Sequence, residues 1–158
     1  LEQTASNSFA LDLKKWRAIM AAYENGGHAY HATLPTDALL GFRNAMAETK
    51  ALGFEALKAS QWALGNGVRA MLKAKGIVSV AADGFGAPGV VVSYTEDPDI
   101  QNGKKFLAHG MQIAAGVPLQ VGEGPEFKTF RLGLFGLDKL ADVDATLARL
   151  KAVVDQVL

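Results

Sequence analysis

The chain has 158 residues, of which 49% are hydrophobic and 20% charged, and its 16 basic residues balance its 16 acidic ones. This composition is typical of a globular protein with one domain and room for a second small piece. Lys and Arg form no run longer than two, which argues against nucleic acid as a main partner, because such a partner requires a basic patch. The chain has no cysteine, which excludes disulfides, thiolate metal sites and a cysteine nucleophile.

No apolar run approaches the length of a membrane span, and the N-terminus shows no signal-peptide pattern. We therefore expect a cytoplasmic protein that does not use a membrane as a partner. The chain begins at Leu1 rather than at a methionine, and its polar start leads straight into a predicted helix. We therefore expect a fragment of a longer protein.

Two helices are predicted in the first third of the chain. The first is capped by Asn7 or Ser8 and is ended by Gly26-Gly27. A second helix begins at a cap formed by Thr36. The apolar stripe of the first helix consists of Phe9, Leu13, Trp16, Met20 and Tyr23.

The segment between these helices, ENGGHAYHATLPTD at 24–37, is expected to be a surface loop. His28 and His31 are three residues apart in it, but no third metal ligand lies nearby, so no metal is assigned. Tyr30 and Thr33 have the same spacing, in a loop bounded by glycines and a proline. Two hydroxyl donors in such a loop can converge on one group of phosphate oxygens. A solvated turn is the alternative interpretation.

A third helix is predicted from about Phe54 to Lys75, with Gly76 as its C-terminal cap. It contains Gly65 and Gly67, and each glycine inside a helix costs about 1 kcal/mol relative to alanine. Close packing against a neighbouring element would explain both glycines.

Two strands are predicted next, at 77–82 and 89–95, and the second is rich in β-branched residues. Gly84, Gly86 and Gly89 lie between or at the start of these strands and match the pattern G-x-G-x-x-G. A dinucleotide site requires a helix to begin there, whereas a proline and then a strand follow in this chain. We interpret the segment as a hairpin connection.

The remaining elements are predicted in this order: a short helix at 99–109 behind the cap Asp97-Pro98, an edge strand within 111–122, a strand from Phe127, and a final helix from about Leu140. Either Asp138 or Asp142 can cap the final helix. The whole order favours an α+β fold, in which helices cover one face of a small, largely antiparallel sheet.

Arg131 is the only charged residue between Thr129 and Leu137. Strand alternation places it on the face opposite Phe130, Leu132 and Leu134. Burying a guanidinium without a partner is costly, and its planar fork suits a carboxylate held by two hydrogen bonds. The alternatives are an arginine paired with a nearby Asp or Glu, or an edge arginine in water.

Three segments resemble one enzyme family. FRLGLFGLDKLADVDATLARL, at 130–150, looks like the C-terminal signature of class V aminotransferases of the alanine–glyoxylate and serine–pyruvate type. AYHATLPTDAL, at 29–39, resembles the Tyr-His-x-Thr-x-Pro segment of that family, and GVVVSYTEDPDIQNGKKFLAHGMQIAAG, at 89–116, is similar to its small domain. The resemblance implies a fold-type-I enzyme that depends on pyridoxal 5'-phosphate and works as a homodimer.

Within that family pattern, residues 1–52 would be the tail of a large domain, carrying the phosphate-contacting loop and a linking helix. Residues 53–158 would be the C-terminal small domain. Carried over motif by motif, the resemblance implies that Arg131 holds the substrate carboxylate. It also implies that Tyr30 and Thr33 contact the cofactor phosphate of the partner subunit.

The implied reaction moves an amino group between a small amino acid, alanine or serine, and a 2-oxo acid, glyoxylate or pyruvate. In the family, the lysine that forms the Schiff base and the acid that pairs with the pyridine nitrogen lie in the large domain, upstream of these segments. No catalytic residue is therefore assigned in this chain, and the chain alone is expected to be inactive.

Two other functions stay open at this point. A phosphonate aminotransferase would use the same cationic site, and a stand-alone ligand-binding or dimerisation module would need no chemistry. An open reading frame that extends roughly two hundred residues upstream, with a lysine after a strand, favours the enzyme over the module. A cysteine desulfurase, by contrast, needs a nucleophilic cysteine that this chain lacks.

Overall fold

The computed structural model describes residues 2–158. By its internal packing the chain divides into two compact units, Leu1–Ala45 and Met46–Leu158. The division falls inside helix α2 (Thr36–Leu52), seven residues before the division at 52/53 that the family pattern implies. The position 52/53 corresponds instead to the break between α2 and α3. The assignment of the two parts to a large and a small domain stays a prediction.

The first unit contains helix α1 (Leu13–Glu24) and the first part of α2. The predicted cap at Asn7 or Ser8 is wrong. Asp12 caps α1, because its Oδ1 accepts a hydrogen bond from the backbone N–H of Lys15 at 3.0 Å. Phe9 therefore precedes the helix and does not belong to its apolar stripe. The predicted end is right, since Asn25 is the C-cap and Gly26 follows with a φ of 77°.

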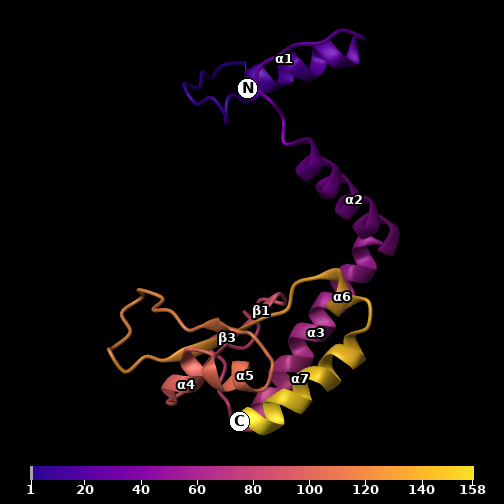
Figure 1. Ribbon diagram of the computed structural model, residues 1–158. Helices are drawn as coiled ribbons and strands as arrows, with labels where there is room; N and C mark the ends of the chain where they lie inside the picture. The colour runs from indigo at the N-terminus through magenta and orange to yellow at the C-terminus, as the bar shows by residue number, and fades with distance from the viewer. Residues whose placement is uncertain (1) are drawn as a thin grey trace. The chain divides into compact units, whose positions relative to one another are not determined.

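The second unit contains a three-stranded sheet and the remaining helices (Figure 1). In chain order its elements are α3 (Phe54–Ala74), β1 (Val90–Tyr94), α4 (Pro98–Gln101), α5 (Lys104–Ala108), β2 (Ala114–Ala115), β3 (Thr129–Gly133), α6 (Leu137–Leu140) and α7 (Val143–Val157). Asp142 caps α7 by accepting from the N–H of Ala145 at 2.9 Å, which decides between the two predicted caps.

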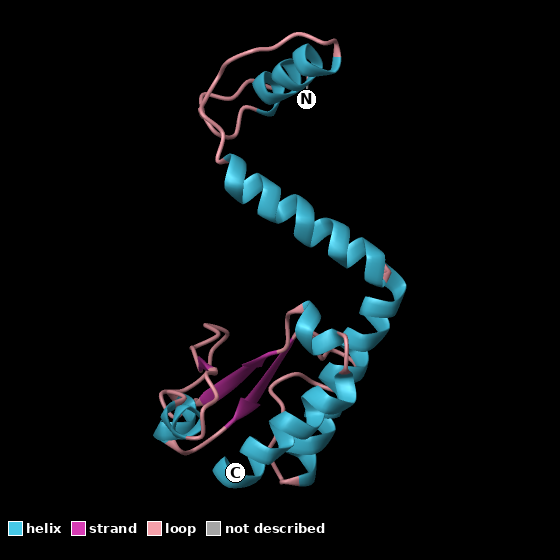
Figure 2. Cartoon of the chain, turned by 45° about the vertical axis from the view of Figure 1, so that its right-hand side comes forward, coloured by secondary structure: helices cyan, strands magenta, loops and turns pink. Residues whose placement is uncertain are grey.

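The sheet has the strand order β1-β3-β2, and both pairs are antiparallel. Figure 2 shows the longer strands lying beside each other, next to the helices of the same unit. In the register, Arg131 of β3 lies opposite Val92 of β1 on one side and Ala114 of β2 on the other. Arg131 therefore stands on the central strand, which excludes the interpretation as an edge arginine.

One face of the sheet carries the core. Phe130, Leu132 and Leu134 are all almost fully buried, and they pack with buried residues of α3, α4, α5 and α7. The rings of Phe130 and of Phe106 in α5 lie 5.8 Å apart between centroids. The predicted α+β class, with helices against a small antiparallel sheet, is confirmed.

The two glycines inside α3 are sites of close packing, as predicted. A Cβ atom at Gly65 would lie 2.6 Å from the carbonyl oxygen of Pro88, and a Cβ atom at Gly67 would lie 2.7 Å from Leu147 of α7. At Gly65 the obstructing atom is backbone and cannot move aside easily, whereas at Gly67 it is the end of the Leu147 side chain, which would have to shift. The glycines therefore let α3 approach the segment before β1 and the C-terminal helix.

The G-x-G-x-x-G match also has a packing explanation. Strand β1, not a helix, follows it, so the rejection of a dinucleotide loop agrees with the structure. A Cβ atom at Gly86 would lie 2.8 Å from Nε of Arg69. The Arg69 guanidinium donates to the carbonyls of Ala87, at 2.7 Å, and Val90, at 3.1 Å. Burial lowers the pKa of this guanidinium from its ordinary value. Arg69, a residue of α3, thus holds the segment before β1 against this helix through hydrogen bonds.

Two predicted elements differ in the structure. The segment 77–82 is not a regular strand, because only Ser79 forms a bridge, opposite Ser93, and the chain then turns near Gly84, which has a φ of 84°. The helix predicted at 99–109 is two short helices, because Gly103 adopts a φ of 81° between α4 and α5.

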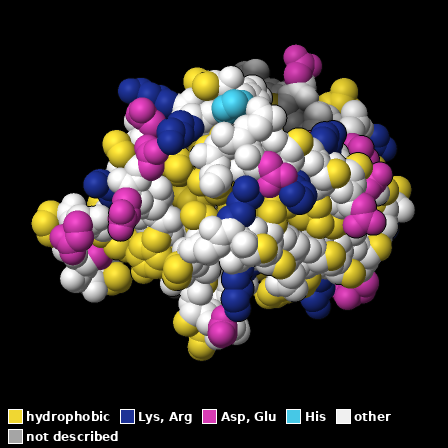
Figure 3. Space-filling model, turned by 90° about the horizontal axis from the view of Figure 1, so that it is seen from below, with side chains coloured by type: hydrophobic (Ala, Val, Ile, Leu, Met, Phe, Trp, Pro, Cys, Tyr) yellow, Lys and Arg dark blue, Asp and Glu magenta, His cyan; other side chains and the backbone are white. Residues whose placement is uncertain are grey.

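No helix in the part of the chain that the structure describes is long and apolar enough to cross a membrane. Positive and negative side chains are interspersed on the face shown in Figure 3, in keeping with the equal numbers of acidic and basic residues.

Candidate functional site

Arg131 projects from the face of β3 opposite the core. Its Nε donates a hydrogen bond to the carbonyl oxygen of Ala115, at 2.9 Å, which fixes the inner end of the guanidinium. Among the described residues, no carboxylate forms an ion pair with Arg131, and no acceptor bonds its terminal amino groups. The alternative that Arg131 pairs with an Asp or Glu of this part of the chain is therefore wrong. The side chain is half-buried, and its Nε is the atom that the described residues hold.

Tyr30 and Thr33 come together in the loop between α1 and α2. The Tyr30 hydroxyl and the Thr33 Oγ1 lie 3.5 Å apart, the outer limit of a hydrogen bond. The Tyr30 side chain is 81% exposed, and Thr33 is exposed as well. The spacing of three residues thus places both hydroxyls on one exposed side of the loop.

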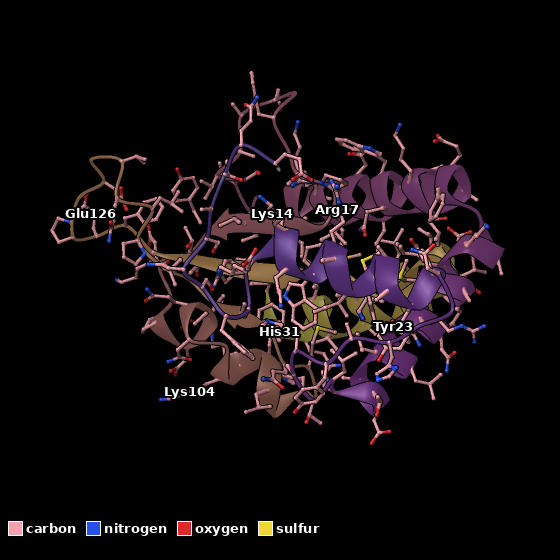
Figure 4. The ribbon with its side chains drawn as sticks, turned by 90° about the horizontal axis from the view of Figure 1, so that it is seen from above. Lys14, Arg17, Tyr23, His31, Lys104 and Glu126 are labelled. Carbon is pink, nitrogen blue, oxygen red and sulfur yellow. The ribbon has the colours of Figure 1, made fainter. Side chains whose placement is uncertain are left out.

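His31 fastens this loop to the N-terminal segment. Its ring packs on Phe9, at 4.5 Å between centroids, and meets the edge of Trp16 in α1 at 5.1 Å. One ring nitrogen, Nε2, lies 3.3 Å from the carbonyl oxygen of Phe9. Figure 4 shows His31 beside α1. Because His31 points inward to this cluster, its neighbour Tyr30 is left pointing outward.

The anchoring role of His31 was missed by sequence reasoning, which considered this residue only as a metal ligand. The described residues contain no group of three or more His, Cys, Asp or Glu side chains placed to hold a metal ion. The sequence does contain the aromatic partners Phe9 and Trp16, but no local pattern links them to His31, which follows Phe9 by 22 residues. Only the folded loop brings them together.

The candidate residues belong to different compact units. Tyr30 and Thr33 lie in Leu1–Ala45, and Arg131 lies in Met46–Leu158. Chemically, Tyr30 and Thr33 offer two hydroxyl donors to an anion with several oxygens, and Arg131 offers a guanidinium fork to a carboxylate. A pocket of about 710 Å³ in the second unit is lined by residues such as Trp62 and Arg69, and includes none of the three candidate residues.

No protein-family model matches the chain, and no curated protein matches it in sequence. Solved structures do match. An alanine–glyoxylate aminotransferase from Nostoc sp. is 17% identical, with a TM-score of 0.73 over 96% of this chain and 39% of that one. A ureidoglycine–glyoxylate aminotransferase from Bacillus subtilis is 21% identical, with a TM-score of 0.67 over 96% of this chain and 38% of that one.

An aspartate aminotransferase of subgroup IV from Thermus thermophilus is 19% identical, with a TM-score of 0.53 over 99% of this chain and 42% of that one. At these identities the likeness shows the fold. The chain spans about two fifths of the length of each solved chain, a share consistent with the C-terminal portion of such an enzyme. The resemblance to aminotransferases that the sequence motifs indicate is therefore present in the fold as well.

Proposed function

We propose that this chain is the C-terminal part of a pyridoxal-phosphate-dependent aminotransferase. The parent enzyme would move an amino group between a small amino acid, such as alanine or serine, and a 2-oxo acid, such as glyoxylate or pyruvate. The observation that carries the proposal is Arg131: its guanidinium is held at Nε and unpaired at its terminal nitrogens among the described residues. It stands on the central strand of a fold shared with aminotransferases.

The substrates explain why this arrangement of Arg131 is useful. An amino acid and a 2-oxo acid both carry a carboxylate bonded directly to the reacting α-carbon. A guanidinium binds a carboxylate through two parallel hydrogen bonds, which sets orientation as well as adding binding energy. One contact therefore orients the amino donor and the 2-oxo acid acceptor in the same way.

The residues of the loop fit a phosphate group. When bound, pyridoxal phosphate supplies an electron sink for the bond that breaks at the substrate α-carbon. Tyr30 and Thr33 would hold its phosphate, because their hydroxyls lie 3.5 Å apart and a phosphate oxygen cluster can accept from both. The exposure of Tyr30 leaves this hydroxyl accessible to such an anion.

We further propose a homodimer in which the loop serves the cofactor of the partner subunit. The support comes from the family pattern and from the exposed apolar side chains around the loop, which include Phe9, Met20 and Tyr23. Aromatic side chains and methionine are enriched at protein interfaces. Cofactor affinity would then depend on dimerisation, because part of the phosphate site would come from the second chain.

The carboxylate role is tested with Arg131→Lys in the full-length parent enzyme. The measurement is kcat/KM for an amino acid and for the amine that lacks its carboxylate. Lysine keeps the charge but loses the fork, so we expect the amino acid to lose about 2–3 kcal/mol of transition-state stabilisation while the amine changes little. Arg149→Lys, on α7, is the matched control and should leave both values unchanged. An unchanged ratio in Arg131→Lys would show that Arg131 is structural.

The loop is tested by mixing two inactive or impaired subunits. One carries Tyr30→Phe, and the other lacks the lysine that binds the cofactor covalently. If the loop acts across the interface, one site of the mixed dimer has both its lysine and an intact Tyr30, so activity should rise above that of the Tyr30→Phe homodimer. Mixing without any gain would show that the loop acts within its own subunit or has no role.

The 158-residue chain alone is expected to have no aminotransferase activity, because none of its lysines lies in a segment that matches the family's cofactor-binding motif. The test is to add pyridoxal phosphate, reduce with borohydride and map any labelled lysine by mass spectrometry. A single stoichiometric adduct that supports alanine-to-glyoxylate turnover would contradict this expectation.

A further inference from the structure

We propose that Gly116 is a positioning residue for Arg131: it holds the Ala115 carbonyl against β3, and that carbonyl sets the direction of the Arg131 guanidinium. The inference rests on the proposed function, in which Arg131 binds the substrate carboxylate. Gly116 itself would touch neither substrate nor cofactor.

The carbonyl of Ala115 is the only hydrogen-bond acceptor of the Arg131 side chain among the described residues, at 2.9 Å from Nε. Ala115 belongs to β2, which is only two residues long and pairs with β3 opposite Phe130 and Arg131. So short a ladder does not hold the carbonyl by itself, and the residue after the strand must help to fix it.

That residue is Gly116, which is enclosed on two sides. Its N–H donates to the carbonyl of Gln101 in α4 at 3.0 Å. On the other side, a Cβ atom at Gly116 would collide with the backbone carbonyl of Thr129 and lie 2.7 Å from Thr129 Oγ1. Thr129 stands two residues before Arg131 on β3 and is only 1% exposed.

The colliding atom at Thr129 is backbone in a central strand, so it cannot move aside without disturbing the sheet. Any side chain at position 116 must therefore push its own segment away from β3, and the Ala115 carbonyl moves with it. Arg131 would then keep its charge but lose its inner hydrogen bond. A long side chain freed in this way samples several rotamers, and a misplacement of about 1 Å at a reacting centre can lower a rate about a hundredfold.

The first test uses this chain and does not depend on cofactor or activity. The exchange of the Arg131 Nε–H proton with water is measured by nitrogen-15 NMR, with the signal assigned by its loss in Arg131→Lys. Gly116→Ala should speed this exchange about tenfold or more, because the bond to Ala115 is lost. Gly133→Ala is the matched control on the same strand, since a Cβ atom there meets nothing within 4 Å. Unchanged exchange in a folded Gly116→Ala chain would overturn the proposal.

The second test uses the parent enzyme and the ratio of kcat/KM for an amino acid over its decarboxylated amine. Gly116→Ala should lower this ratio roughly tenfold to a hundredfold, by raising KM for the amino acid and lowering kcat, while the amine is spared. A purely structural effect would lower kcat/KM equally for the amino acid and for the amine. If Gly116→Ala does not fold, Ala115→Gly replaces it, because it loosens the same carbonyl without a clash. An unchanged ratio in the folded variant would overturn the inference.

The two proposals fail in different ways. If Arg131→Lys leaves the ratio unchanged, the carboxylate role of Arg131 is wrong. If Arg131→Lys lowers the ratio and Gly116→Ala does not, the carboxylate role stands and only the positioning role of Gly116 is wrong.

Discussion

The two compact units differ most in what they bury. In residues 2–45 only Ile19 is a buried hydrophobic residue, at 9% exposure, whereas all the other buried hydrophobic residues lie in Met46–Leu158. Arg131 therefore lies on a packed sheet, whereas Tyr30 and Thr33 lie on a loop held mainly by the contacts of His31.

Helix α2 also lacks a buried face. It has no buried residue over its 17 residues, although it presents large apolar side chains that include Leu39, Phe42 and Met46. Exposed apolar side chains in such number mark a contact surface. The exposed apolar side chains of α2 are therefore available to contact a further surface.

The largest effect that separates the two regions is expected from truncating one aromatic residue in each. Phe130 is fully buried against Phe106, so Phe130→Ala should lower the free energy of unfolding of the second unit by about 3–5 kcal/mol. Tyr30→Ala, at an 81% exposed position of the first unit, should change the free energy of unfolding of that unit by less than about 0.5 kcal/mol. Urea unfolding followed by circular dichroism measures both. Equal losses of unfolding free energy in the two variants would show that the two units do not differ in how tightly these residues are packed.

Two glycines, one inside α3 and one inside α2, allow a second comparison of the two units. At Gly65 in α3, a new Cβ atom would strike the Pro88 carbonyl, which also accepts a hydrogen bond from Gln61 at 3.0 Å. Gly65→Ala should therefore lower the free energy of unfolding by about 1–3 kcal/mol.

The matched variant is Gly41→Ala in α2, where a Cβ atom meets open space. It should stabilise the helix by about 0.5–1 kcal/mol, because glycine loses more backbone freedom than alanine. The measurement is the urea midpoint of each variant, which should fall for Gly65→Ala and rise for Gly41→Ala. Stabilisation by Gly65→Ala would show that the approach of α3 to Pro88 is loose.

Strongly periodic segments were predictable from the sequence, and the contrast between the units explains why. Helices α3 and α7 and strands β1 and β3 bury one face each, so their apolar residues recur at the period of the element. Arg131 was found for the same reason, as a lone charge on the outer face of a buried strand. An element that buries one face therefore has an apolar periodicity that can be recognised in the sequence alone.

Other features depend on contacts that leave no local pattern. The segment 77–82 has strand-like composition, but it forms one bridge at Ser79 and then ends in alanines, which have low strand propensity. Gly103 looks tolerable inside a helix, yet its left-handed conformation divides 99–109. The bond from Arg131 to Ala115 and the packing of His31 on Phe9 join residues 16 and 22 positions apart. Neither could be predicted from spacing.

Thr129 provides a smaller effect inside the well-packed unit. Its Oγ1 is buried and has no hydrogen-bond partner among residues 2–158, whereas the buried hydroxyl of Thr146 donates to the Lys139 carbonyl at 3.1 Å. Thr129→Val removes an unsatisfied polar atom, so it should raise the free energy of unfolding by about 1 kcal/mol. Thr146→Val removes a satisfied one and should lower it by a similar amount. Destabilisation by Thr129→Val would indicate that a water molecule bonds this hydroxyl.

The smallest expected effect is a pH dependence of stability that comes from Asp97, which lies in the same unit as Arg131. Asp97 caps α4, whose Gln101 carbonyl binds the Gly116 N–H. The Lys105 ammonium, together with the backbone N–H groups of α4, holds the pKa of Asp97 below its usual range. A carboxyl group whose pKa is lowered by folding stabilises the fold above its unfolded pKa, and this contribution is lost as the pH falls through the lower, folded value.

Asp97→Asn isolates this contribution, because asparagine still caps a helix but does not titrate. The wild-type chain should be more stable than the variant at neutral pH, and the difference should shrink as the pH falls through the folded pKa of Asp97. Glu123 and Asp155 also have lowered pKa values, but they are present in both proteins and cancel in the difference. The effect should be small and weakened by salt, because the carboxylate faces solvent. The measurement is urea unfolding of both proteins from neutral to acid pH. A difference that grows towards acid would mean that Asp97 is protonated more easily in the folded chain, opposite to the cap geometry.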